Sequence, residues 1–296
     1  MTGYTVAIDD TPAAWKTVEW VDGALRPGDR VRLLTVSEFY GETYTRSEGR
    51  LDAAERRLAE SHPDVVIAHD IVGGPTADRL VLDGSRDDVL VIGSQQVHRF
   101  TATLAGRVAE RVVAHSTRPV LVVPENWERT EGPVLVGVDS VTAAAALGFA
   151  ADLAGRSGRD LVLVRAWRPI YDSLPYSGVY LDEDRDLWEH EGRLELDAAI
   201  RAIGKAHPDL HVRGARREGS IADSLLHEAA AEHAALIVVG RRHHSALSAF
   251  LGGSVSEEIM HRGHTPLCVV PPTAVPDAAT RVIENAATAA RVSRTE

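Results

Sequence analysis

The residues best suited to chemistry form a glycine-rich stretch near the end of the chain. Gly240 closes an apolar run, and glycine permits a turn with positive φ there. Gly252 and Gly253 let backbone N–H groups approach a ligand, because no Cβ stands in the way. Ser254 opens a helical pattern, and a helix start favours an anion such as phosphate. The stretch indicates phosphate binding, although Ser254-x-x-Glu257 is also a capping box, which by itself needs no ligand and is the simpler interpretation.

Other nucleotide and nucleophile chemistries lack residues that they need. Asp9 and Asp10 follow the first apolar run, as an acidic pair does in phospho-receiver domains, but that chemistry needs a lysine on the last strand. The chain's two lysines, Lys16 and Lys205, lie elsewhere, and neither follows a P-loop pattern. No Gly-x-Gly-x-x-Gly follows a strand, and no Gly-x-Ser-x-Gly occurs. The sequence therefore does not predict a receiver domain, a P-loop protein, a dinucleotide-binding protein or a serine hydrolase.

The histidines and the one cysteine do not form a recognisable metal site. His243 and His244 are adjacent, and neighbours in a loop rarely share one metal ion. His261 and His264 lie near a helix end, where a cation interacts well with the helix dipole. No cysteine or carboxylate spacing completes a site around them, and Cys268 lies in an apolar run that predicts a buried thiol. We therefore expect no metal site in the protein itself.

The glycine-rich stretch belongs to an internal repeat. A spacing of 147 residues relates Gly93, Gly106 and Pro124 to Gly240, Gly253 and Pro271. The second copy also holds an insertion, residues 168–191, whose tyrosines fit either a lid or a packed surface. We expect one domain over residues 1–125, a second over 132–272, and a polar tail over 273–296.

Each copy alternates short apolar runs with helical patterns. Runs without polar alternation predict strands buried on both faces, and alternating strands and helices build a parallel sheet with right-handed crossovers. We expect an α/β fold with two doubly wound sheets of five strands. In the second copy the expected strands are 134–138, 161–166, 210–213, 236–239 and 267–270. The expected helices there are 143–154, 187–206, 221–232 and 255–261.

The combined pattern resembles the universal stress protein family. The resemblance rests on an Asp after the first strand, a Gly-x-x-Gly-x(9)-Gly-Ser/Thr pattern after the fourth, and Pro-Val-x-Val-Val-Pro at the last. It covers both copies, from Tyr4 to Pro272, and so implies two domains of that family in one chain. It further implies sheets of order 3-2-1-4-5, of the adenine nucleotide alpha hydrolase-like type. Members with the full glycine motif bind ATP, and Mg²⁺ is expected with it.

The resemblance assigns roles to residues of the second copy. Asp139 is expected to contact the adenine, and Ala166 to form a wall beside it. Arg242 adds positive charge, whereas His243 replaces the second glycine of the motif and either blocks the ligand or contacts phosphate. The remaining positions hold the ribose and phosphates or supply N–H groups, namely Gly240, Gly253, Ser254, Val255 and Ser256.

The first copy departs further from the family pattern. Gly93 and Gly106 are kept, but Gln96 replaces the second glycine and Arg107 replaces the serine or threonine. Arginine cannot cap a helix as serine does, so we expect a degenerate, structural copy. Asp9 is expected to persist as a strand-end residue that bonds loop amides.

Composition narrows the function further. The formal net charge is −11, without a basic cluster, so we expect no nucleic-acid partner. No apolar run is long enough to cross a membrane and no secretory signal is visible. One cysteine is most simply placed in a reducing cytoplasm.

Two functions remain open from the sequence. The first is a cytoplasmic stress-response protein that binds ATP or another adenine nucleotide in its C-terminal copy. No general base can be placed beside the phosphates, so we expect at most slow ATP hydrolysis. The second is an interaction or scaffold protein of the same fold that binds no nucleotide. In either case the resemblance implies that the last strands, Val120–Val123 and Leu267–Val270, pair edge to edge as an internal pseudo-dimer, with a homodimer as a further step. This pairing would also hide two apolar sheet edges.

Overall fold

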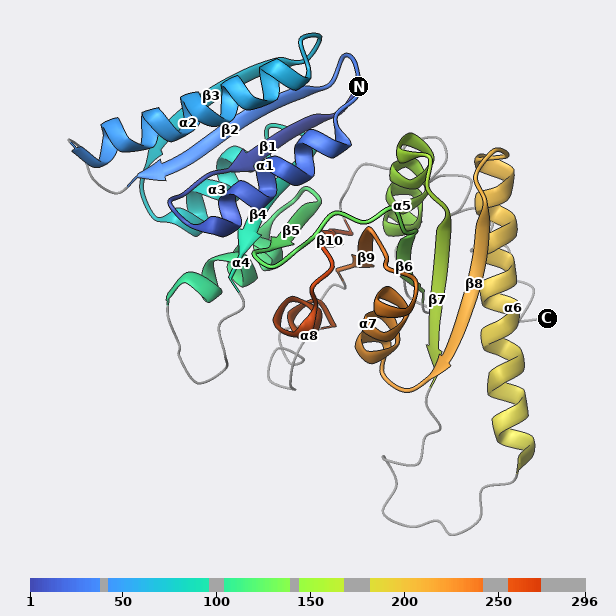
Figure 1. The fold of residues 1–296 in the computed structure, drawn as a ribbon. Helices are drawn as coiled ribbons and strands as arrows, with labels where there is room; N and C mark the ends of the chain where they lie inside the picture. The colour runs from blue at the N-terminus through green and yellow to red at the C-terminus, as the bar shows by residue number, and fades with distance from the viewer. Residues whose placement is uncertain (38–41, 96–103, 139–143, 168–181, 242–254, 273–296) are drawn as a thin grey trace. The chain divides into compact units, whose positions relative to one another are not determined.

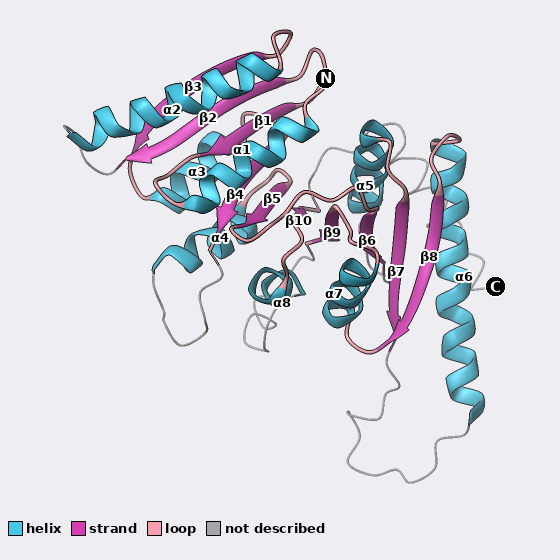
Figure 2. Cartoon of the chain, viewed as in Figure 1, coloured by secondary structure: helices cyan, strands magenta, loops and turns pink. Residues whose placement is uncertain are grey.

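The computed structural model describes residues 1–37, 42–95, 104–138, 144–167, 182–241 and 255–272. These residues form two compact units (Figure 1). The first unit holds Met1–Arg129 and the described residues from Ser256 onward, and the second holds Thr130–Val255. Each unit is an α/β structure in which strands and helices alternate along the chain (Figure 2).

The first unit contains a parallel sheet in the order β3-β2-β1-β4-β5. This is the expected order 3-2-1-4-5. Its strands are β1 (Gly3–Ala7), β2 (Arg30–Ser37), β3 (Val66–Gly73), β4 (Val89–Ser94) and β5 (Val120–Pro124). Its helices are α1 (Pro12–Ala24), α2 (Glu42–Ser61), α3 (Thr76–Gly84) and α4 (Leu104–His115), joined by α8 (Val255–Arg262) ahead of β10 (Leu267–Val270).

Helices cover both faces of this sheet. Successive side chains of a strand point to opposite faces, and β1 shows the alternation. Tyr4 packs edge-on against Trp20 of α1, with ring centroids 6.5 Å apart. Thr5 points the other way, and its hydroxyl donates to Asp87 Oδ2, just before β4, at 2.6 Å. Both side chains are buried, as expected for a strand that is covered on both faces.

β10, the last strand among the described residues, pairs with β5 of the first repeat. The pairing is antiparallel, with Cys268 opposite Leu121 and Val269 opposite Val120. This confirms the expected pairing of the two last strands, and it covers an apolar edge of β5 that would otherwise be exposed. Cys268 is fully buried, and burial raises the pKa of its thiol. The buried-thiol prediction is therefore confirmed.

The second unit contains a parallel sheet in the order β9-β6-β7-β8. Its strands are β6 (Val134–Val138), β7 (Leu161–Trp167), β8 (Val212–Glu218) and β9 (Leu236–Gly240). Helices α5 (Ala144–Ser157) and α6 (Asp182–Ala206) pack together on one face, and α7 (Ile221–Ala231) contacts β6, β7 and β9. Among the described residues, no helix is long and apolar enough to cross a membrane.

The expected strand at 210–213 was wrong in extent. β8 begins at Val212 and continues to Glu218, through a segment with three arginines. It lies at the edge of the sheet, and its residues alternate between half-buried and exposed. Because an edge strand is only half covered, its polar residues concealed it from a search for apolar runs.

Candidate functional site

The carboxyl ends of β6, β7 and β9 meet at one edge of the second unit's sheet. Val138 is opposite Arg165 of β7, and Val136 is opposite Val238 of β9. The same register continued by two residues puts Gly240 level with Val138. In a doubly wound sheet, ligands bind outside the carboxyl ends, at the point where the strand order reverses. That point here lies between β6 and β9, because the chain leaves β6 toward β7 and later returns on the other side of β6.

Two of the expected site residues lie at this edge. Ala166 is the last residue but one of β7 and is half-buried, and Gly240 is the last residue of β9. Val255 and Ser256 are the first two residues of α8, as expected for a helix that follows the glycine-rich stretch. The other expected residues, Asp139, Arg242, His243, Gly253 and Ser254, lie outside the described residues.

Arg165 adds positive charge at the same edge. Its Nη2 lies 3.1 Å from Glu195 Oε2 of α6, and both side chains are about four-fifths buried, at 20% and 19% exposed. Its Nη1 donates to the carbonyl oxygen of Val138 at 3.5 Å. The ion pair therefore holds a guanidinium beside the last residue of β6, immediately before Asp139. Arg165 directly precedes Ala166, and a charged residue inside an apolar strand is the sequence signal that could have revealed it.

Arg241 places a second guanidinium next to Gly240. It is half-buried, and desolvation by burial lowers its pKa below the usual arginine value. An arginine stays protonated at neutral pH even so. The strand ends on both sides of β6 thus carry arginines, an arrangement that suits an anionic ligand.

The first repeat uses its corresponding residues for its own structure. Asp9 Oδ1 accepts from the backbone N–H of Thr11 at 2.9 Å and from its hydroxyl at 2.5 Å. Asp9 therefore bonds a loop amide, as expected for a strand-end residue. Gly93 has a packing reason: an added Cβ would lie 2.8 Å from the carbonyl carbon of Ala13 in α1. Gly106 and Arg107 lie in the first turn of α4, but their side chains are outside the described residues.

A protein-family model and individual relatives agree over most of the chain. A model of the universal stress protein family matches residues 5–124 and again 132–271. Universal stress protein Rv2623 of Mycobacterium tuberculosis is 28% identical over 295 residues, covering 90% of this chain and 95% of that protein. Universal stress protein Rv1996 of the same organism is 26% identical over 309 residues, covering 90% and 94%.

Solved structures share the fold at lower sequence identity. A universal stress protein from Archaeoglobus fulgidus superposes with a TM-score of 0.63 at 16% identity, covering 91% of this chain and 96% of that one. The protein PA1789 of Pseudomonas aeruginosa, described as functionally unknown, superposes with a TM-score of 0.61 at 16% identity, covering 99% and 98%. These likenesses establish the two-domain α/β fold and carry no information on ligands.

Proposed function

Because the chain belongs to the universal stress protein family, with two domains of that family in tandem, we propose that its second repeat binds an adenine nucleotide. The nucleotide is ATP, held with Mg²⁺, and its occupancy serves a regulatory role in a stress response. The observation that carries the proposal is the edge at which β6, β7 and β9 end. There the strand order reverses, and Ala166, Gly240 and two arginines lie at the ends of the two strands that flank β6.

The proposed roles follow the family pattern. Asp139 contacts the adenine and Ala166 forms a wall beside it. Gly240, Gly253 and Ser254 hold the ribose and the phosphates, and the start of α8 supplies backbone N–H groups. The guanidinium of Arg165, held by Glu195, contributes positive charge at the strand ends.

The first repeat is proposed to be a structural copy. Its Asp9 is engaged by Thr11, and its Gly93 is required by the close approach of α1. Since the sequence assigns no general base beside the phosphates, we propose a binding protein with at most slow hydrolysis. We place it in the cytoplasm, with repeat domains at 1–125 and 132–272 and further dimerisation through like surfaces.

Titration calorimetry with ATP and Mg²⁺ on the full chain tests the proposal. Gly253→Val is expected to abolish binding, because its side chain fills the space where the backbone meets the ligand. His243→Gly is expected to preserve or tighten binding, because it restores the family motif. Asp139→Ala is expected to weaken binding at least about tenfold, as loss of a charged hydrogen-bond partner does.

The repeat supplies a matched control. Asp9→Ala changes the equivalent aspartate of the first copy and is expected to leave the ATP affinity unchanged. If neither Gly253→Val nor Asp139→Ala alters the affinity, or if the wild-type chain does not bind ATP, the nucleotide proposal is wrong. The protein would then act through its surface alone, as an interaction protein of the same fold.

A further inference from the structure

Three potential metal ligands come together between two helices of the first unit. They are Glu110 of α4 and Glu257 and His261 of α8, and their ligand atoms all lie within 4.8 Å of one another. His261 Nε2 lies 3.0 Å from Glu110 Oε1. Glu257 and His261 are four residues apart, so they share one face of α8, one turn apart.

The repeat and the strand pairing explain why these side chains meet. Glu110 and Glu257 are separated by 147 residues, the same spacing that relates the two glycine motifs, so they are equivalent positions of the two copies. The helices that carry them precede β5 and β10, and these strands pair antiparallel. Equivalent carboxylates are therefore brought face to face. His261 has no counterpart, because Ala114 occupies that position in the first copy.

The charges of this cluster favour a cation. Two carboxylates this close repel each other. A divalent ion between them would be attracted by both. The imidazole favours zinc or a similar transition metal over Mg²⁺ and Ca²⁺, which prefer oxygen ligands.

The spacing of the donors also fits such an ion. Zinc binds histidine nitrogen and carboxylate oxygen at about 2.0–2.2 Å, which puts donors of a tetrahedral site roughly 3.3–3.5 Å apart. The His261–Glu110 pair is already near this spacing, and the Glu257 ligand atom lies within 4.8 Å of both. His261 and Glu110 are 29% and 35% exposed, which leaves room for water as a further ligand.

We propose that Glu110, Glu257 and His261 form a binding site for a divalent transition-metal ion, with zinc as the reference ion. Since the ligands come from α4 and α8, bound metal fastens α8 onto the first repeat and stabilises the packing of β10 on β5. None of these three ligands belongs to the proposed nucleotide site, so the metal proposal does not depend on nucleotide binding. The sequence did not predict it, because its third ligand comes from the other copy of the repeat.

Zinc titration calorimetry on the chelator-treated full chain, without nucleotide, tests the site. The wild type is expected to bind one ion tightly. Glu110→Gln, Glu257→Gln and His261→Gln are each expected to weaken that event by more than about tenfold, since even a supporting contact of a metal ligand is worth 10–100-fold. Cobalt offers a second readout, because its visible absorption band reports ligand number and should be altered in each variant.

Neighbouring residues provide the controls. Glu258→Gln alters an adjacent glutamate on α8 that pairs with Arg262 instead, and His115→Gln alters a histidine of α4 that bonds its own helix at Arg111 O. Both are expected to bind zinc as the wild type does. Zinc should also raise the melting temperature of the wild type and of both controls, but not of the three site variants.

Two outcomes would overturn the proposal. One is a wild type that does not bind zinc with a stoichiometry of one ion per chain. The cluster would then be a histidine–glutamate ion pair only. The other is zinc binding unchanged in Glu110→Gln and Glu257→Gln, which would assign the ion to other histidines. These two variants keep the side-chain volume and lie on different helices. A variant that melts cooperatively without metal is folded, so its zinc affinity decides the question.

Discussion

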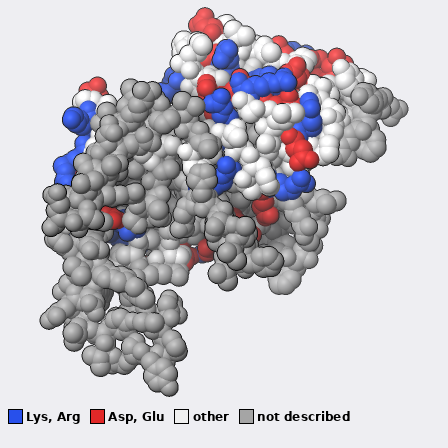
Figure 3. Space-filling model, turned by 180° about the vertical axis from the view of Figure 1, so that it is seen from behind, with Lys and Arg blue, Asp and Glu red and all other residues white. Residues whose placement is uncertain are grey.

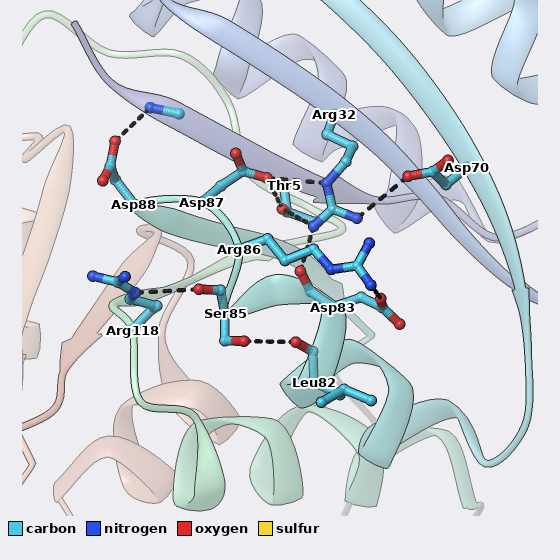
Figure 4. Close-up of polar contacts among 11 residues, drawn as sticks. Thr5, Arg32, Asp70, Leu82, Asp83, Ser85, Arg86, Asp87, Asp88 and Arg118 are labelled. Carbon is cyan, nitrogen blue, oxygen red and sulfur yellow. Dashed lines mark hydrogen bonds and ion pairs between the residues drawn. The ribbon is translucent and has the colours of Figure 1, made fainter.

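At the scale of single residues, one guanidinium organises the polar side of the first sheet (Figure 4). Arg32 of β2 donates from Nε to Asp87 Oδ2 at 3.0 Å and from Nη2 to Thr5 Oγ1 at 2.9 Å. It also donates to the carbonyl oxygen of Asp83 and pairs with Asp70 of β3 at 3.5 Å. One side chain thus connects β1, β2 and β3 to the segment between α3 and β4.

Loss of this guanidinium should destabilise the first unit. Arg32→Ala removes the guanidinium partner of the 15% exposed Asp87 carboxylate, which then keeps the hydrogen bond from the buried Thr5 hydroxyl. We expect a cost of about 3 kcal/mol, typical of breaking a mostly buried ion pair. Urea unfolding of the full chain at pH 7 measures it. Arg30→Ala removes an exposed arginine from the same strand and should change stability by less than about 0.5 kcal/mol. Equal effects would show that the network contributes nothing specific.

At the scale of elements, the approach of α1 to β4 depends on one glycine. An added Cβ at Gly93 would lie 2.8–2.9 Å from the carbonyl carbon, the carbonyl oxygen and the Cβ of Ala13. Real Cβ atoms do not come this close to backbone, so the helix must shift. The glycine that aligns with a nucleotide motif therefore has a sufficient explanation in packing in this copy.

Gly93→Ala should therefore destabilise the protein without any ligand. We expect a loss of about 1–3 kcal/mol, the usual cost of overpacking. Thermal unfolding in nucleotide-free buffer measures it. Gly155→Ala is the control, because nothing lies within 4 Å of its added Cβ and α5 should gain up to about 1 kcal/mol from the alanine. A Gly93→Ala variant as stable as the wild type would refute the packing explanation.

Ion pairs between elements are frequent on the described surface. On the described part of the face in Figure 3, basic and acidic side chains lie next to one another. Arg111 of α4 pairs with Asp78 of α3 at 2.9 Å, and Arg213 of β8 pairs with Glu232, just after α7, at 2.9 Å. Such exposed pairs contribute little to stability, about 0–1 kcal/mol each. The chain has more acidic than basic residues, with a net charge of −11, and these pairs place arginines of each unit next to acidic partners of the same unit.

At the scale of the whole chain, β10 is the segment that makes the repeats interdependent. It belongs to the second repeat in sequence, yet it pairs with β5 and lies in the first compact unit. Val269 is 2% exposed and lies opposite Val120. Displacing β10 would expose the apolar residues of both strands, which is how edge strands cause aggregation.

A lysine in this strand should loosen that pairing. Val269→Lys buries a charge without a partner, and we expect a loss of at least about 2 kcal/mol, with more light scattering on heating. Differential scanning fluorimetry and static light scattering measure the two effects. Val66→Lys is the control, because Val66 lies on the edge strand β3 and is already 67% exposed. A Val269→Lys variant as stable and soluble as the control would contradict the role assigned to β10.

The sequence by itself determined the repeat and the alternating strands and helices, because local apolar periodicity is a property of the chain itself. Cys268 was placed correctly for the same reason. The pairing of the last strands was expected from the family resemblance and agrees with the need to cover apolar sheet edges. Ala166 and Gly240 could also be placed at strand ends, because a strand boundary is a local property.

Only the tertiary structure decided which distant side chains meet. The distances from Glu110 to His261 and from Arg165 to Glu195 depend on how helices pack over the sheets, and residue spacing along the chain does not encode them. The limits of β8 and the reason for Gly93 became visible in the same way. Both depend on what lies across from the residue in space: open solvent beside an edge strand, and the backbone of Ala13.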